Sequence, residues 1–385
     1  AKGDVKISIN NGDRIITTEP GSSLLSTLAG QKIFLPSACG GKGSCGMCKC
    51  QVDSGAGSIL PTETGFFSYK QQHENWRLAC QVKVKENIEM RIPESVMGIK
   101  KWECTVVSNR NISTFLKEFV VKLPEGENLK FKSGGYIQID VPALDVDFKD
   151  MIIDEKYKGD WEKMKMFDLK MHNPEPTYRA YSMANSPAEG NIIMLNIRIA
   201  TPPFDRAAGA FAPVNPGICS SFIFSRKPGD KVTISGPYGE FFLRETNNEM
   251  MFIGGGAGMA PMRSHIFNLF HTIHTDRKVT FWYGARALQE APYVDEFNKI
   301  QEENPNFHWT LALDRPDPVA DAAGVAYKPG FVHQVIFENY LKNHENPEDI
   351  EYYLCGPPMM IQAVTKMLYD LGVPDENVMY DNFGG

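Results

Sequence analysis

Four cysteines in this chain have a spacing that could bind an iron–sulfur cluster. Cys39, Cys45 and Cys48 lie in one glycine-rich loop, and Cys80 follows Cys48 after 31 intervening residues. Four thiolates are the usual ligands of a [2Fe-2S] cluster, and the plant-type pattern C-x4-C-x2-C…C differs only by one residue in the first gap. Zinc is the main alternative, although structural zinc sites normally take their ligands as two short-spaced pairs. We predict that these four cysteines bind a [2Fe-2S] cluster.

A second group of residues could bind a flavin. Arg179 could neutralise a pyrophosphate, the ring of Tyr181 could stack on a planar heterocycle, and the hydroxyl of Ser182 could reach a ring nitrogen. A segment that opens a predicted helix, whose free N–H groups suit phosphate, contains Gly217, Cys219, Ser220 and Ser221. Each motif alone is weak, because Arg-x-Tyr-Ser on a strand more often serves pairing and packing. Together, in this order, they predict a flavin site.

A third group follows two predicted buried strands. After the first strand come Gly254, Gly255, Gly256, Ala257 and Gly258, and after a later strand come Cys355, Gly356 and Pro357. The run is not the G-x-G-x-x-G fingerprint and could be only a tight strand-to-helix turn. Because ligands bind at the carboxyl ends of parallel strands, we predict a dinucleotide pyrophosphate at the glycines and a nicotinamide ring near Cys355. The alternative for Cys355 is a buried turn cysteine.

Three domains are expected to position these groups, since 385 residues exceed one ordinary core. Residues 1–95 show a hairpin (5–10 and 14–18), a short helix (22–30) and strands at 77–84 and 88–92, which indicate a small α+β domain of the β-grasp, ferredoxin-like kind. Residues 101–245 contain short strands, turns and prolines, typical of an antiparallel β-barrel. Residues 246–385 alternate strands and helices, which predicts a doubly wound parallel α/β domain.

Several other residues have simpler interpretations. Residues 142–176, within the barrel region, are predicted to be a long irregular excursion, and such loops are usually functional or partner-facing. His265, His271 and His274 have no ligand partners in the sequence, so we expect surface or packing roles. Cys50 is expected to be a small buried side chain on a strand.

Composition excludes several classes of protein. With a net charge of −7 and no dense basic run, the chain is not expected to bind nucleic acid. Its longest uncharged window, residues 207–225, is interrupted by prolines and cannot span a membrane. The clustered thiols favour a reducing, cytosolic compartment.

The motifs resemble the ferredoxin–NADP reductase superfamily and, within it, the F subunits of sodium-translocating NADH:quinone oxidoreductases. Beyond the cysteines, the similarity lies in RLAC (77–80), KWECT (101–105), RAYSMAN (179–185), GGGAGMAPMRS (254–264), FWYGAR (281–286) and DNFGG (381–385). It covers essentially the whole chain, including residues 142–176.

The resemblance implies roles for individual residues. Arg179 would pair with FAD phosphates, Tyr181 would stack on the isoalloxazine, and Ser182 would lie near N5. Residues 217–221 would hold the pyrophosphate, and NADH would lie across 254–258 and 355–357. The residues placed closest to the reacting atoms are Tyr181, Ser182, Cys355 and Phe383, of which Phe383 would cover the other flavin face.

The resemblance also implies an activity. NADH gives up a hydride to FAD, which can pass single electrons to the [2Fe-2S] cluster and on to membrane subunits. Such a protein works at the cytoplasmic face of the bacterial inner membrane. The family carries an N-terminal transmembrane helix that this sequence lacks, so the chain is similar to the soluble part of such an F subunit.

Two other functions stay open. One is a soluble NADH-dependent reductase component of a multicomponent oxygenase, and the other is a redox sensor that only binds flavin. Arg286 could meet the 2′-phosphate of NADPH or be a solvated loop residue. The resemblance favours NADH.

Overall fold

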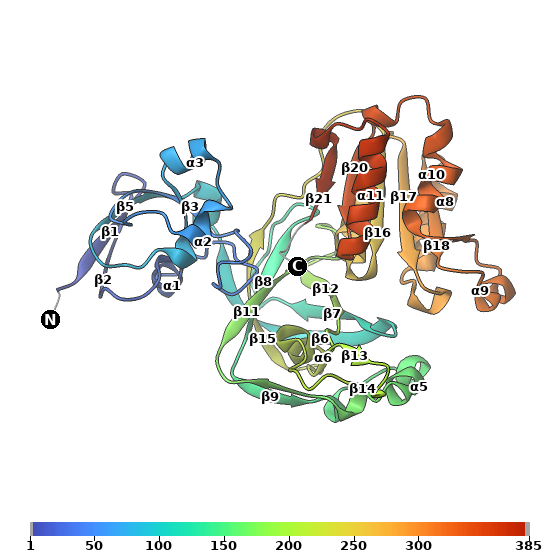
Figure 1. Cartoon of the computed structure of the whole chain (residues 1–385), viewed down its shortest axis with the longest axis horizontal. Coiled ribbons are helices and arrows are strands. Elements are labelled where there is room, and N and C mark those ends of the chain that lie inside the picture. Colours follow the sequence, from blue (N-terminus) through green and yellow to red (C-terminus); the bar gives the residue numbers. More distant parts are fainter. Residues whose placement is uncertain (1–2, 382–385) are drawn as a thin grey trace.

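Three large sheets occupy successive parts of the chain in the computed structural model, which describes residues 3–381 (Figure 1). The first is a mixed sheet of five strands in the order β2-β1-β5-β3-β4. The strands are β1 (Val5–Ile9), β2 (Arg14–Thr18), β3 (Lys49–Ser54), β4 (Trp76–Leu78) and β5 (Ile88–Arg91). The predicted hairpin is confirmed, because β1 and β2 pair antiparallel. Helix α1 (Leu24–Gly30) starts at Ser23, whose Oγ accepts a hydrogen bond of 3.1 Å from Ser26 N.

The strand predicted at 77–84 is wrong beyond Leu78. Residues Ala79–Gln81 form a single 3-10 turn, η1, instead. Ala79 N donates to Cys48 O at 2.9 Å, so the backbone here turns toward the cysteine loop and leaves the sheet. This turn carries Cys80.

The second sheet is antiparallel, with six strands in the order β11-β8-β15-β6-β7-β12. Their bounds are β6 (Lys100–Ser113), β7 (Leu116–Lys122), β8 (Tyr136–Val141), β11 (Thr177–Ser182), β12 (Ile192–Arg198) and β15 (Lys231–Tyr238). A bridge between Met183 and Leu195, and a 2.7 Å hydrogen bond from Ala184 N to Met194 O, join its two edges. The sheet therefore closes into the predicted barrel. Helix α6 (Ile218–Phe224) covers one of its ends.

Residues 142–176 are ordered, so the expectation of an irregular excursion is wrong. Strands β9 (Leu144–Asp147) and β10 (Lys170–Asn173) pair as an antiparallel ribbon. Between them lie helix α5 (Glu155–Lys163) and the turns η2 (Phe148–Asp150) and η3 (Met166–Asp168). Phe148, Trp161 and Met171 are buried in the barrel core, which is why this segment folds against the barrel.

The third sheet is parallel, with six strands in the order β19-β18-β17-β16-β20-β21. Their bounds are β16 (Met250–Gly255), β17 (Val279–Ala285), β18 (Phe307–Leu313), β19 (Lys328–Pro329), β20 (Glu351–Cys355) and β21 (Val378–Tyr380). Helices α7 (Met259–Phe267) and α8 (Val294–Glu303) pack on one face of the sheet, and α10 (Val332–Asn339) and α11 (Pro358–Asp370) pack on the other. The predicted doubly wound α/β architecture is confirmed.

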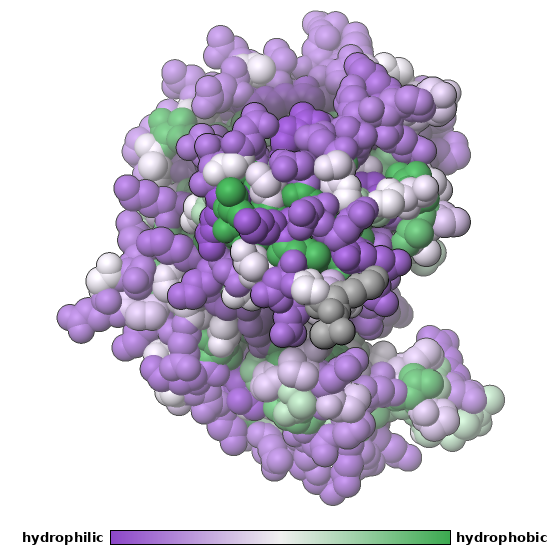
Figure 2. Space-filling view, turned by 90° about the vertical axis from the view of Figure 1, so that its left-hand side faces the viewer, coloured by the Kyte–Doolittle hydropathy of each residue, from purple (hydrophilic) through white to green (hydrophobic). Residues whose placement is uncertain are grey.

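The surface around the first sheet is mostly hydrophilic. Hydrophobic residues form small patches there, separated by hydrophilic ones (Figure 2). Within residues 3–381, no helix has the length and apolar character needed to cross a membrane.

Candidate functional site

The four predicted cluster ligands lie close together as two pairs. The thiol of Cys39 faces that of Cys45, and the thiol of Cys80 faces that of Cys48. Cys80 N also donates to Cys48 Sγ at 3.4 Å. No three Cys, His, Asp or Glu side chains of the described residues converge as a single metal ion would require. Two pairs of thiols suit a cluster with two irons, since each iron then takes two protein sulfurs.

Hydrogen-bond donors around two of these thiols favour the thiolate, the form that binds iron. Burial alone would raise the pKa of Cys39, but N–H groups of Cys45 and Ser44 point at its sulfur and lower the pKa to about 6. The pKa of Cys80 falls to about 7 because the Cys48 thiol and the Gln81 amide donate to it. These donors suit an anionic cluster.

Residues 39–48, the cluster loop, need glycine for space as well as for conformation. Gly46 has φ +67°, and a Cβ there would lie 2.2 Å from Cδ1 of Phe66. Gly40 has φ +70°, and a Cβ there would lie 2.9 Å from both Arg179 Nη1 and Thr177 Oγ1. The loop therefore lies directly against β11. Cys50 is fully buried in the core of the first sheet, as expected.

An ion pair that the sequence did not indicate supports Cys80, the fourth predicted ligand. Arg77 Nε and Nη2 each donate to a carboxylate oxygen of Glu63 at 2.9 Å, with side-chain exposures of 7% and 0%. Glu63 Oε1 also accepts from Leu78 N at 2.9 Å. Because Leu78 ends β4 just before the η1 turn, this pair fixes the backbone that carries Cys80.

Strand β11 and helix α6 bring the two candidate flavin segments together. The hydroxyl of Tyr181 lies against the Cys219 thiol, and burial raises the pKa of Cys219 to about 12. Arg179 Nη1 donates to Thr177 Oγ1 at 2.9 Å and to Tyr178 O at 2.7 Å. The guanidinium thus lies along β11, between the flavin segment and the cluster loop.

The start of α6 has the features of a phosphate-binding turn. Ser220 Oγ accepts from Ala200 N at 3.0 Å, which fixes the turn against the end of β12. Ser221 Oγ is buried and has no hydrogen-bond partner among the described residues. Gly217 is required here, since a Cβ would lie 2.6 Å from that of Ala200. An unsatisfied hydroxyl beside a helix N-terminus fits the FAD pyrophosphate expected at residues 217–221.

The glycine loop and the Cys355 turn meet at one edge of the parallel sheet. Strands β16 and β20 are neighbours, and Gly254 stands opposite Cys355 in the register. A Cβ on Gly258 would lie 2.0 Å from Cys355 O, so only glycine allows this approach. Tyr283 OH donates to Gly256 O at 2.8 Å and holds the loop from β17. The expected juxtaposition of the two motifs is therefore present.

The remaining glycines of this edge pack against α11. A Cβ on Gly255 would lie 2.9 Å from Met360 Sδ, and one on Gly356 would lie 2.5 Å from Met360 Cε. Pro357 stands directly before α11. Close packing of backbone and helix is thus a second reason for the small residues here.

Asp381, an acidic residue that the sequence did not indicate as part of the site, contacts β11. Ser182 Oγ donates to Asp381 Oδ2 at 2.7 Å. Burial raises the pKa of Asp381 to about 6. Burial raises the pKa of the Cys355 thiol, and the negative charge of Asp381 raises it further, which places the three side chains in one neighbourhood. Phe383 lies outside the described residues.

Of the three histidines, His265 has the packing role that was one of our two expectations. It is fully buried, with Nδ1 2.9 Å from Ser133 Oγ and Nε2 3.1 Å from Phe241 O. Burial lowers its pKa to about 3.

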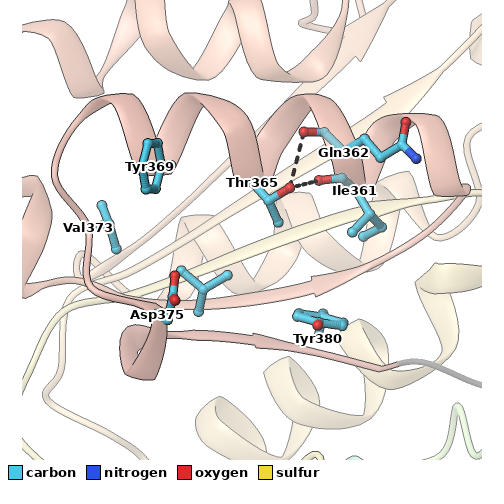
Figure 3. Close-up of a pocket in the computed structure, with 8 residues that line it drawn as sticks. Ile361, Gln362, Thr365, Tyr369, Val373, Asp375 and Tyr380 are labelled. Atoms are coloured by element: carbon cyan, nitrogen blue, oxygen red, sulfur yellow. Dashed lines mark hydrogen bonds between the residues drawn. The ribbon is translucent and has the colours of Figure 1, made fainter. Parts of the chain in front are cut away.

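A surface pocket lies away from these groups. Figure 3 shows it between α11 and the segment that contains β21. Its volume is about 600 Å³. It is lined by Ile361, Gln362, Thr365, Tyr369, Val373, Asp375, Val378 and Tyr380. None of the predicted site residues lines it.

The chain matches three domain families in the expected order. Residues 7–85 match the 2Fe-2S iron-sulfur cluster binding domain, residues 163–243 the oxidoreductase FAD-binding domain, and residues 252–366 the oxidoreductase NAD-binding domain. The predicted set of cofactors is confirmed at the level of these families.

Relatives that match over the whole of this chain show the family to which it belongs. The F subunit of the Na(+)-translocating NADH-quinone reductase of Methylococcus capsulatus is 54% identical over 385 residues, which cover 100% of this chain and 93% of that protein. The F subunits of Idiomarina loihiensis and Pseudomonas aeruginosa are 54% and 52% identical, each covering 100% of this chain and 92% of the relative. The chain belongs to this family of F subunits.

Solved structures outside this family share the fold. The Amycolatopsis cytochrome P450 reductase GcoB superposes with a TM-score of 0.66 at 24% identity, covering 98% of both chains. The ferredoxin reductase in carbazole 1,9a-dioxygenase gives 0.62 at 24% identity, covering 99% of this chain and 98% of that one. These likenesses confirm the three-domain architecture of the chain. The roles of its individual site residues stay predictions.

Proposed function

We propose that this chain is the electron-input subunit of a sodium-pumping NADH:quinone oxidoreductase, at the cytoplasmic face of a bacterial inner membrane. It oxidises NADH and delivers electrons singly to other subunits of the complex. One observation carries the proposal: strand β11, which bears Arg179, Tyr181 and Ser182, also forms the surface on which the cluster loop lies.

Polar contacts support this arrangement. Gln138, on the neighbouring strand β8, donates from Nε2 to Ser37 O at 2.8 Å, and both residues are buried. Ser37 Oγ in turn accepts from Gly41 N at 3.3 Å inside the cluster loop. The barrel thus holds the loop through a buried residue two positions from Cys39.

Apolar packing supports it as well. Ala38, beside Cys39, packs in one group of buried apolar side chains with Ala180 of β11 and with two barrel tyrosines, Tyr136 and Tyr238. The centroids of the two stacked tyrosine rings lie 5.3 Å apart. Cys45 packs against the same group of apolar side chains. Burial of these apolar side chains stabilises the contact between β11 and the loop that carries Cys39 and Cys45.

The chain's residues then have distinct tasks. Bound FAD supplies the exchange between the two electrons of a hydride and the single electrons that a [2Fe-2S] cluster carries. Arg179 and residues 217–221 bind its phosphates, while Tyr181 and Ser182 orient its ring. Residues 254–258 and Cys355 hold the nicotinamide nucleotide at the edge of the parallel sheet. The cysteine pairs hold the cluster beside β11.

A reconstitution experiment tests this function. A strain that lacks its own F subunit is given an F-subunit gene in which this sequence replaces the matching region. Its membranes should then regain NADH-dependent quinone reduction and sodium uptake. NADPH should support a lower kcat/KM than NADH. If the chain restores neither activity but supplies electrons to an oxygenase component, it is a soluble reductase instead.

A further inference from the structure

Residues 142–176 contact both cofactor-binding parts of the molecule, although the proposed function gives them no task. The segment leaves the barrel after β8 and returns to it at β11. Asn173 Nδ2 donates to Pro142 O at 2.8 Å and closes its base. Lys117, a buried lysine of β7, donates from Nζ to Ile152 O, so the segment also satisfies a cation of the barrel.

The first contact reaches the turn before α6. His172 N donates to Asn215 Oδ1 at 2.9 Å, and Asn215 Nδ2 donates back to His172 O at 2.7 Å. Asn215 stands two residues before Gly217, where the FAD pyrophosphate segment begins. Both bonds use only the backbone of His172, so the side chain of Asn215 makes the connection.

The second contact reaches the other end of α6. The ring of Trp161 in α5 stacks on Phe224 with centroids 5.9 Å apart and an interplanar angle of 18°. Trp161 is fully buried, and its Nε1 donates to Thr114 O at 2.7 Å. Helix α6 has only seven residues, so contacts at both of its ends determine where it lies.

The third contact reaches the nucleotide domain. Gln289 Nε2 donates to Asp160 Oδ2 of α5 at 2.8 Å and to Thr114 Oγ1 at 2.9 Å. Gln289 belongs to the turn η6 (Leu288–Glu290), which follows β17 at its carboxyl end. That end is the edge at which a dinucleotide binds beside residues 254–258.

We propose that residues 142–176 position two cofactor sites. The contact with Asn215 positions residues 217–221, where FAD is expected, and the Asp160–Gln289 contact positions the edge of the parallel sheet beside residues 254–258. This inference rests on the proposed function, which assigns the cofactors to those elements. Asn215 and Asp160 are positioning residues, because neither is placed against a reacting atom.

Binding of FAD to flavin-free protein, followed by flavin fluorescence, tests the first contact. Asn215→Ala should raise the Kd for FAD about three- to tenfold, as expected for the loss of one or two net hydrogen bonds. Val214→Ala is the matched control, since Val214 is adjacent and 55% exposed. An unchanged Kd in Asn215→Ala, or an equal rise in the control, overturns the positioning role of the Asn215 contact. Wild-type protein that binds no FAD would instead overturn the proposed function.

Steady-state kinetics with NADH test the second contact. Asp160→Ala should raise KM about two- to fivefold, with a smaller change in kcat and no change in the Kd for FAD. Asp160→Asn keeps an acceptor oxygen and should restore the wild-type KM. Lys163→Ala, on an exposed position of the same helix, is the control. Equal KM values in Asp160→Ala and wild type, or a failure of Asp160→Asn to restore KM, overturn this contact.

Discussion

Ser182 Oγ donates a 2.7 Å hydrogen bond to Asp381 Oδ2 and joins β11 to a residue 199 positions later in the chain. Ser182 stands beside Tyr181 on the flavin strand, and Asp381 follows β21 at the edge of the parallel sheet. This bond therefore connects the barrel to the parallel-sheet domain, beside the proposed flavin and nicotinamide sites.

The stability of this contact should depend on pH. Burial raises the pKa of Asp381 from 3.8 to about 6, so the folded protein binds a proton that the unfolded chain has already lost. Stability contributed by this carboxyl is then fully present below about pH 4 and is lost as the pH rises through about 6. Asp381→Asn should raise the Tm of flavin-free protein at about pH 8 and leave it nearly unchanged at about pH 4. Equal Tm differences at both pH values would contradict the assignment.

The Glu63–Arg77 pair should be essential to the first domain. Glu63→Ala leaves the buried guanidinium without its carboxylate and should lower the free energy of unfolding by about 3–5 kcal/mol. It should also weaken the absorbance of the cluster, because the strand before Cys80 loses its anchor. Urea unfolding and the visible spectrum measure both effects.

The chain offers a control for that variant. Asp53 pairs with Arg91 in the same domain, but the two side chains are 40% and 47% exposed. Asp53→Ala should therefore cost about 0–1 kcal/mol. If the two variants cost the same, burial of the Glu63–Arg77 pair is not what stabilises the domain.

Gly40→Ala should separate the cluster loop from β11. Its Cβ would lie 2.9 Å from Arg179 Nη1 and Thr177 Oγ1, in addition to the strain of φ +70°. Gly57→Ala has nearly the same strain, with φ +69°, but meets nothing within 4 Å. Rapid mixing with NADH should show slower cluster reduction in Gly40→Ala only. Equal rates in the two variants would indicate that the contact with β11 does not matter.

Gly258→Ala should abolish NADH oxidation, because its Cβ would lie 2.0 Å from Cys355 O. The visible spectra of flavin and cluster should remain, since neither lies on this loop. Gly256→Ala has φ +52° and open space, so it should cost only about 1–2 kcal/mol of backbone strain. Steady-state rates with NADH compare the two variants, and a fully active Gly258→Ala would show that the loop can move away from Cys355.

Local patterns explain which parts of the fold and site the sequence could predict. The cysteine spacing and the glycine run after β16 act within a few residues, so their chemistry is readable without a structure. Glu63 and Asp381 act on residues far along the chain, and nothing near either of them indicates that partner. Asp381 stands in the DNFGG ending that the resemblance used, yet only the bond to Ser182 shows its contact.

The two errors in the fold have a common physical cause. Beyond Leu78 the residues have strand composition, but Ala79 N bonds to Cys48 O and leaves the sheet. Residues 142–176 are polar enough to read as a loop, but Trp161 and Met171 find a core in the barrel. In both cases tertiary contacts outweigh local propensity.

Anaerobic mixing of the FAD-containing and cluster-containing protein with NADH tests the central claim most directly. Flavin absorbance and the EPR signal of the reduced cluster are followed in wild type and in Cys45→Ala, which removes one predicted ligand of the first cysteine pair. We predict that wild type shows both flavin bleaching and the EPR signal, and that Cys45→Ala shows bleaching alone. A wild-type flavin that stays oxidised, or an unchanged EPR signal in Cys45→Ala, would contradict the account.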